Sequence, residues 1–272
     1  MGDCVLLLKA RTGGNGLQKI LSDPQEGIRL LGLSLLNLSE GKSYQGRWMD
    51  REAVLVLLQG DAQVKAGDHN FTGLHRDGVF HQKATSVYVP VGVPFEVENT
   101  GSERAEFALC TTVVSELEER LQPFAVYPDE VQDRRVGREN WQREVHDIMV
   151  ANVEGRVQRI IVGETFNQPG NWSSFPPHKH DDYQPGVEAC MEEVYHYRLD
   201  PPGGFGVQLI YTADRSLDEA YTVRDRDTFL VPRGYHPLSA AGGYRLYYLW
   251  MMAGETGRTM IPHDDPDYAW LK

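Results

Sequence analysis

Residues 171–198 read NWSSFPPHKHDDYQPGVEACMEEVYHYR and combine a His-x-His pair with two adjacent glutamates. His178 and His180 stand two positions apart, and on a β-strand such residues point to the same face. Glu193 opens the alternating run 194–198, which predicts a neighbouring strand. Two imidazoles and one carboxylate could therefore meet at one point.

A third histidine follows a second predicted strand. The run 228–232 (TFLVP) leads into a Pro-Arg-Gly turn, and His236 follows two residues after Gly234. A lone His-x-His pair is more often a surface feature, but the Pro-Pro before this pair, the strand beginning at Glu193 and the position of His236 favour a metal site. Three histidines and one carboxylate suit a divalent metal, with Zn²⁺ expected first and Mn²⁺ or Fe²⁺ as alternatives.

Bulk properties set limits on the protein class. The 272 residues are 41% hydrophobic, which allows one large domain or two ordinary ones. No apolar run is long enough to span a membrane, and the first residues lack the cationic start of a signal peptide. Cys4, Cys110 and Cys190 are odd in number and widely spaced, which favours the reducing cytoplasm and no disulfide framework. The net charge of −12 disfavours nucleic acid as a partner.

Short apolar runs punctuated by glycine and proline predict an all-β sandwich or barrel. Residues 52–60 (EAVLVLLQG) are expected to form a buried strand that ends in a Gly60-Asp61 hairpin, with residues 62–65 as its returning partner. A short, charged surface helix is expected over residues 114–121.

Residues 122–148 differ in character, being polar and dense in charge. We expect a solvated connection between two β-units. The alternative is that this segment packs across the second unit and supplies Arg135, Arg138 or Arg143 to a site.

An internal repeat is visible. Residues 52–58 (EAVLVLL) compare with 193–199 (EVYHYRL), and 87–92 (VYVPVG) compare with 229–234 (FLVPRG) at nearly the same spacing. Two similar β-units in tandem are therefore predicted.

The two copies differ in chemistry. No His-x-His pair precedes Glu52, and Pro94 stands at the place of the third histidine. We therefore expect an N-terminal domain over residues 1–121 without metal ligands, a connecting segment over 122–148, and a C-terminal domain over 149–272 that carries the metal site.

The order His-x-His, Glu, then Pro-x-Gly and His in a short-strand fold resembles the cupin metal motif, and its duplication resembles a bicupin of two tandem double-stranded β-helix (jelly-roll) barrels. More closely, the chain is similar to the 5-deoxy-glucuronate isomerase family of bacterial myo-inositol catabolism. It resembles the 4-deoxy-L-threo-5-hexosulose-uronate ketol-isomerases more loosely. The resemblance covers most of the chain and rests on segments 170–181, 192–198, 230–237 and 247–254.

This resemblance implies an aldose-to-ketose isomerisation that turns 5-deoxy-D-glucuronate into 5-dehydro-2-deoxy-D-gluconate through an enediol. A divalent metal on the sugar oxygens would stabilise the developing charge. The register of the Glu192-Glu193 pair is ambiguous. We take Glu193 as the ligand because Val-Tyr-x-Tyr follows it directly, as in the related isomerases.

The proton-transfer groups are less defined. If Glu193 points inward, strand parity points Tyr195 and Tyr197 inward too, with His196 and Arg198 outward. These tyrosines, or Gln208 on another predicted strand, could contact substrate, and plain barrel packing is the alternative. Candidates for binding the substrate carboxylate are Arg233, Arg224 and Lys179, each of which could equally be a surface charge.

Two other functions stay open at this point. The same ligand set would serve an Fe²⁺-dependent cupin dioxygenase, and a bicupin can also be a non-catalytic sugar-binding module. The expected partner is a small-molecule uronate, with neither nucleic acid nor membrane. Edge strands in cupins often pair between subunits, which favours a homo-oligomer.

Overall fold

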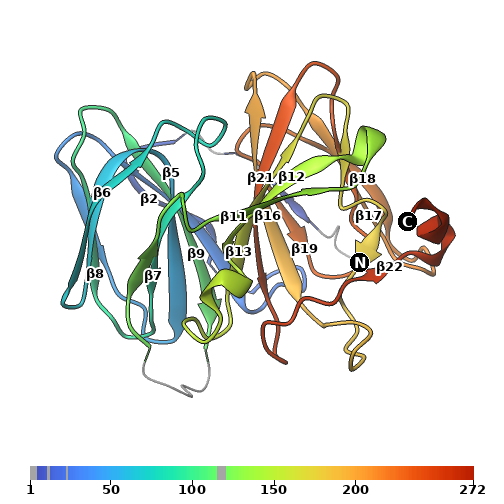
Figure 1. Cartoon of the computed structure of the whole chain (residues 1–272), viewed down its shortest axis with the longest axis horizontal. Helices are drawn as coiled ribbons and strands as arrows, with labels where there is room; N and C mark the ends of the chain where they lie inside the picture. Colours follow the sequence, from blue (N-terminus) through green and yellow to red (C-terminus); the bar gives the residue numbers. More distant parts are fainter. Residues whose placement is uncertain (1–4, 11–12, 23, 115–120) are drawn as a thin grey trace.

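Short strands make up most of the chain in the computed structural model, which describes residues 5–10, 13–22, 24–114 and 121–272. Two β-units lie side by side (Figure 1), and the expected all-β fold is confirmed. The helix expected over 114–121 falls mainly on residues 115–120, outside this description. In the described part of the chain, no helix is both long and apolar enough to cross a membrane.

The first unit is a nine-stranded sheet folded into two layers. Its longest strand, β5, pairs with β7 and β9 along its first half, and with β6 and β8 along its second. The strands are β2 (Gly16–Leu21), β3 (Leu31–Leu38), β4 (Ser43–Gly46), β5 (Arg51–Ala66), β6 (His69–Arg76), β7 (Thr85–Val89), β8 (Phe95–Asn99), β9 (Ala105–Val113) and β10 (Phe124–Val126).

The hairpin expected at Gly60-Asp61 is wrong. β5 continues through this point to Ala66, and the turn to β6 lies at Gly67 and Asp68. Gly60 has a φ of +100°, and a Cβ there would lie 2.8 Å from the Cα of Ala105. Glycine therefore lets the strand bend from one layer into the other where β9 runs close by.

The continuous apolar run in β5 is explained by burial on both faces. Ala53, Leu55 and Leu57 pack into a core inside the first unit. Val54 and Val56, on the opposite face, belong to a larger core that also contains residues of the second unit. The two units are therefore joined by a shared apolar core.

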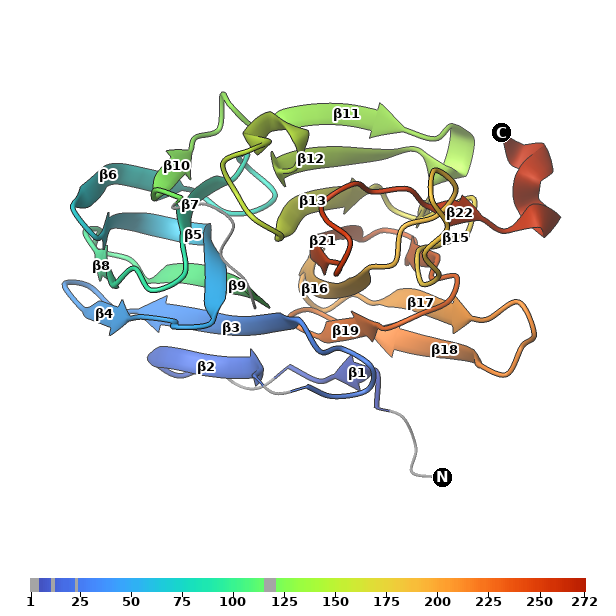
Figure 2. The same ribbon diagram turned by 90° about the horizontal axis from the view of Figure 1, so that it is seen from below.

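The second unit has a seven-stranded sheet, with a four-stranded sheet and a two-stranded ribbon beside it. The chain's first strand, β1, joins the seven-stranded sheet by pairing with β19, and both lie near the second unit's lower edge in Figure 2. The elements are β1 (Leu7–Leu8), β11 (Gln132–Val136), η1 (Glu139–Trp141), β12 (Arg143–Met149), η2 (Ala151–Val153), β13 (Ile161–Asn167), β14 (Trp172–Ser173), β15 (His178–Lys179), β16 (Glu192–Asp200), β17 (Gly206–Tyr211), β18 (Asp218–Val223), β19 (Thr228–Val231), β20 (Leu238–Ala240), β21 (Arg245–Ala253), β22 (His263–Asp264) and η3 (Pro266–Leu271).

The solvated connection expected over residues 122–148 is wrong. β10 pairs with β7 of the first unit, while β11 and β12 extend the second unit's sheet beyond β13. The polar residues lie mainly on β11, the exposed edge strand, whereas Trp141 and Val145 are buried. Strand pairing thus crosses the limits at 121 and 148, and the division into 1–121, 122–148 and 149–272 stays a prediction.

Two buried glutamates tie the units together reciprocally. Glu52 on β5 accepts hydrogen bonds from the backbone N–H groups of residues 158–160 at 2.7–3.0 Å. Glu192 on β16 accepts from those of residues 29–31 at 2.6–2.8 Å. Each carboxylate satisfies backbone donors of the other unit just before a central strand begins, which fixes how the two sheets meet.

The matching roles of these glutamates correct the alignment of the internal repeat. β5 pairs Ala53 with Val89, whereas β16 pairs Glu193 with Val231. The counterpart of Glu193 in the first unit is therefore Ala53 and not Glu52, which corresponds to Glu192.

Substituting Glu192→Gln tests this inter-unit contact. The amide loses the charge and has only one oxygen for three backbone donors, so we expect the free energy of unfolding to fall by about 2–4 kcal/mol. Urea denaturation followed by circular dichroism measures the change. Glu40→Gln, in an exposed turn, is the matched control, and an equally small loss in both variants would contradict the assigned role.

Candidate metal centre

Three histidines from two segments of the chain converge in the second unit. His178 lies on β15, His180 directly after it, and His236 after β19. The ring of His236 lies 4.9 Å from that of His178 and 5.0 Å from that of His180, between centroids. One nitrogen from each ring can be chosen so that all three lie within 4.8 Å of one another, so this group could hold a metal ion.

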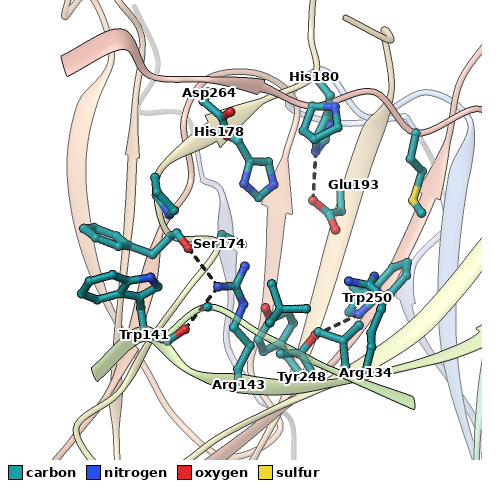
Figure 3. Close-up of a pocket in the computed structure, with 18 of the residues that line it drawn as sticks. Arg134, Trp141, Arg143, Ser174, His178, His180, Glu193, Tyr248, Trp250 and Asp264 are labelled. Atoms are coloured by element: carbon teal, nitrogen blue, oxygen red, sulfur yellow. Dashed lines mark hydrogen bonds and ion pairs between the residues drawn. The ribbon is translucent and has the colours of Figure 1, made fainter. Parts of the chain in front are cut away.

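Glu193 on β16 joins the three rings, as Figure 3 shows for His178 and His180. One carboxylate oxygen lies 3.1 Å from Nε2 of His180 and 3.4 Å from Nε2 of His236. The neighbouring Glu192 points away to the first unit. Strand alternation thus separates two adjacent glutamates into one inter-unit contact and one group of the candidate centre.

Backbone carbonyls orient two of the rings. Nδ1 of His180 lies 2.8 Å from the carbonyl oxygen of Met191, and Nδ1 of His236 lies 2.9 Å from that of Gly234. A carbonyl only accepts, so each Nδ1 carries a proton, and in the neutral form of each ring the Nε2 lone pair is free to bind a metal next to Glu193. Nε2 of His236 is buried without a hydrogen-bond partner among the described residues. A cation between these lone pairs and the carboxylate would satisfy them.

The pKa shifts of the clustered histidines and of Glu193 are consistent with a metal site. Burial, together with neighbouring His236 and His180, lowers the pKa of His178 well below its ordinary value. Burial alone would raise the pKa of Glu193, but the adjacent rings of His180 and His236 outweigh it and lower the pKa to about 2. Burial opposes protonation of His180, yet Glu193 raises the pKa of that ring. An ionised carboxylate therefore lies beside a neutral His178 ring, which is the protonation state in which both groups can bind a metal.

A cavity of about 640 Å³ opens onto His178, His180 and Glu193. Apolar side chains, among them Met191 and Trp250, form part of its wall, and strands β11 and β12 with the chain's last residues form another part. Its cationic lining side chains are Arg134, Arg138, Arg143 and Lys272.

Of the predicted proton-transfer residues, Tyr195 lines the cavity, and its hydroxyl lies 3.2 Å from Oγ of Ser174. Tyr197 and Gln208 are buried behind it, where the Tyr197 hydroxyl donates to Oε1 of Gln208 at 2.8 Å. Nε2 of Gln208 donates to the carbonyl of His236 at 2.9 Å. Tyr197 and Gln208 therefore support the segment that carries His236 and do not line the cavity.

The predicted carboxylate-binding residues do not come together at the cavity. Arg233 and Arg224 are exposed and absent from its lining. Lys179 points away from the lining and donates to Asp181 at 2.7 Å and to Glu188 at 2.7–2.8 Å. Strand parity explains Lys179, because it lies between the two histidines and must face the other way.

The cavity instead takes its arginines from the segment expected to be a linker. Arg138 and Arg143, named only in the alternative interpretation of that segment, line the cavity together with Arg134, which was missed. Tyr248 was also missed; its hydroxyl lies 2.5 Å from Oγ of Ser173. The available signal was the apolar pattern of residues 145–149 within a polar stretch, which is typical of a strand with one buried face.

Two joined β-units with a three-histidine, one-glutamate cluster in one of them define a bicupin. In fold, the chain is similar to the Lactobacillus farciminis oxalate decarboxylase, with a TM-score of 0.66 at 12% identity over 96% of this chain and 87% of that one. Residues 6–271 match the KduI/IolB family. The chain belongs to this family.

Individual relatives support the assignment. The 5-deoxy-glucuronate isomerase of Geobacillus kaustophilus is 38% identical over 90% of this chain and 87% of its own length. That of Bacillus subtilis subsp. natto is 35% identical over 87% and 86%. An IolB-like protein of Salmonella typhimurium LT2 has a crystal structure that superposes with a TM-score of 0.88 at 34% identity, covering 98% of both chains.

The contact between Lys179 and Glu188 can be tested by Lys179→Met. Glu188 is almost fully buried, so removing its cation should lower the free energy of unfolding by about 1–3 kcal/mol. Thermal and urea denaturation of the metal-free protein measure the change. Lys42→Met, in an exposed turn, serves as control, and unchanged stability of the Lys179 variant would show that this ion pair does not hold the histidine-bearing strand.

Proposed function

We propose that the protein is a metal-dependent aldose–ketose isomerase that converts 5-deoxy-D-glucuronate to 5-dehydro-2-deoxy-D-gluconate, a cytoplasmic step of myo-inositol catabolism. The observation that carries the proposal is the cluster of three histidines and Glu193, of which His178, His180 and Glu193 line one cavity, in a chain of this family. The curated relatives named 5-deoxy-glucuronate isomerase support the substrate.

His178, His180, His236 and Glu193 are the proposed metal ligands. Three neutral nitrogens and one carboxylate suit Zn²⁺ best, while Mn²⁺ and Fe²⁺ accept the same donors. When bound, such a metal would supply Lewis-acid polarisation of the substrate's carbonyl and neighbouring hydroxyl. The buried Nε2 of His236, which has no hydrogen-bond partner among the described residues, supports this role for the group.

The chain's own side chains can orient and exchange protons with the sugar. Burial raises the pKa of Tyr195 well above its ordinary value and also raises that of Tyr248. Both phenols therefore stay protonated at neutral pH and can donate hydrogen bonds to sugar oxygens. Isomerisation also needs a base for the carbon-bound proton, and Asp264 is the carboxylate side chain of the described cavity lining other than the proposed ligand Glu193.

Replacing His236 with alanine tests the ligand set. Loss of a supporting contact around a metal typically lowers affinity 10–100-fold, so loss of a direct ligand should lower it by at least about 100-fold. Zinc content, measured by atomic absorption after dialysis, should fall together with isomerase activity. His69→Ala, on an exposed part of β6, is the control. An active His236 variant with full zinc content would refute the assignment.

The activity itself is tested by anaerobic incubation of the purified protein with 5-deoxy-D-glucuronate in deuterated water, with and without chelator. Proton NMR should record formation of the ketose that stops when the metal is removed. Deuterium at the new hydroxymethyl carbon would support an enediol that exchanges with solvent. Absence of turnover contradicts the proposal, and oxygen uptake with Fe²⁺ and a substrate panel would favour a dioxygenase instead.

A further inference from the structure

Arg143 begins β12 and sends its side chain into the cavity that holds the candidate metal centre. Figure 3 shows its guanidinium rising into the space below His178 and Glu193. Two backbone carbonyls fix its position, because Nη1 donates to Phe175 at 2.9 Å and to Trp141 at 3.2 Å. The side chain is thus held in one place by contacts that leave its charge unneutralised.

No carboxylate lies within ion-pair distance of Arg143 among the residues that the structure describes. Its remaining nitrogens, Nε and Nη2, have no hydrogen-bond partner among the residues that the structure describes. Burial, together with the nearby charge of Arg134, lowers the pKa of Arg143, while Tyr248 and Tyr195 act in the opposite direction. Keeping a mostly buried cation without an acidic partner costs free energy, and such an arrangement is typical of a site that awaits an anion.

The other cationic side chains of the cavity lining differ from Arg143. Arg134 is exposed and paired with Asp147 at 3.2 Å. Lys272 is paired with Asp264. Arg138 is exposed and donates to the carbonyl of Leu271 at 3.0 Å. Arg143 is therefore the cation of this lining that is both mostly buried and without an acid.

We propose that Arg143 is the residue that binds the carboxylate of the substrate and selects an aldose acid over a neutral aldose. This inference rests on the proposed function, because it places the sugar's carbonyl end at the histidine cluster and its carboxylate end at β12. The edge formed by Nε and Nη2 presents two parallel N–H donors, which match the two oxygens of a carboxylate.

The binding of two unreactive probes to the zinc-loaded protein tests the proposal. One probe is borohydride-reduced 5-deoxy-D-glucuronate, the acid alditol, which keeps the carboxylate but has no aldehyde to isomerise. The other is the neutral alditol with a hydroxymethyl group in place of the carboxylate. Isothermal titration calorimetry should show that the wild-type protein prefers the acid alditol by about 100-fold.

Arg143→Met should abolish this preference, weakening the acid alditol about 100-fold while leaving the neutral alditol unchanged. Arg143→Lys keeps the charge but lacks the paired N–H donors of the guanidinium, so it should retain part of the preference for the acid alditol. Arg135→Met is the matched control, because Arg135 is exposed on β11 and faces away from the cavity lining. Zinc content and melting temperature identify any variant that has lost the fold, in which case the lysine variant carries the test.

The outcomes separate this proposal from the isomerase activity. If Arg143→Met abolishes the preference for the acid alditol, Arg143 binds the carboxylate. This holds even if the wild-type protein fails to convert 5-deoxy-D-glucuronate, which would reject only the isomerase activity. Arg143 is not the carboxylate-binding residue if the wild type shows no preference for the acid alditol or if Arg143→Met retains that preference. The same follows if Arg143→Met weakens the binding of both alditols equally.

Discussion

Strand alternation along β16 is the constraint on which both the fold and the site depend. Glu193 and Tyr195 point to the cavity, whereas Glu192 and Arg198 point to the first unit. A shift of one residue would bury the wrong set on each side. Arg198 pairs with Glu106 of β9 at 3.0 Å, so the two contacts from β16 to the first unit also fix the strand that presents Glu193.

The second unit carries chemistry that the first cannot. At the equivalent positions of the first unit, Ala53 stands in place of Glu193 and Pro94 in place of His236. The first unit instead packs Val54 and Val56 against the second and supplies Glu52 to the backbone of residues 158–160. Its contribution is therefore to support the unit that holds the candidate centre.

Much of the candidate site follows from local sequence, because it depends on short-range rules. The alternation of side chains along a strand places His178 and His180 on one face, and a Gly turn after a strand brings His236 close to them. The bend at Gly60 was mistaken for a hairpin because glycine permits both, and only the close approach of β9 decides between them. Whether Glu193 met the histidines depended on pairing between β16 and β19, which a single segment does not encode.

The charged side of the cavity was harder to predict. β11 is an edge strand with a solvated face, so its composition resembles that of a linker, and the burial of β12 depends on β13 being its neighbour. Arg143 combines a place in the cavity wall with the lack of an acidic partner among the described residues, and both are properties of the folded chain. Arg233 and Arg224 lie close to His236 in sequence, but the sheet directs them to the surface.

The proposed function requires one divalent metal bound by side chains that come from three separate segments of the chain. Anomalous difference density from zinc-loaded crystals, measured above and below the zinc edge, tests it most directly. One strong peak is expected about 2.0–2.2 Å from a ring nitrogen of each of His178, His180 and His236 and from an oxygen of Glu193. A main peak elsewhere, or one that Glu193 does not contact, would contradict it.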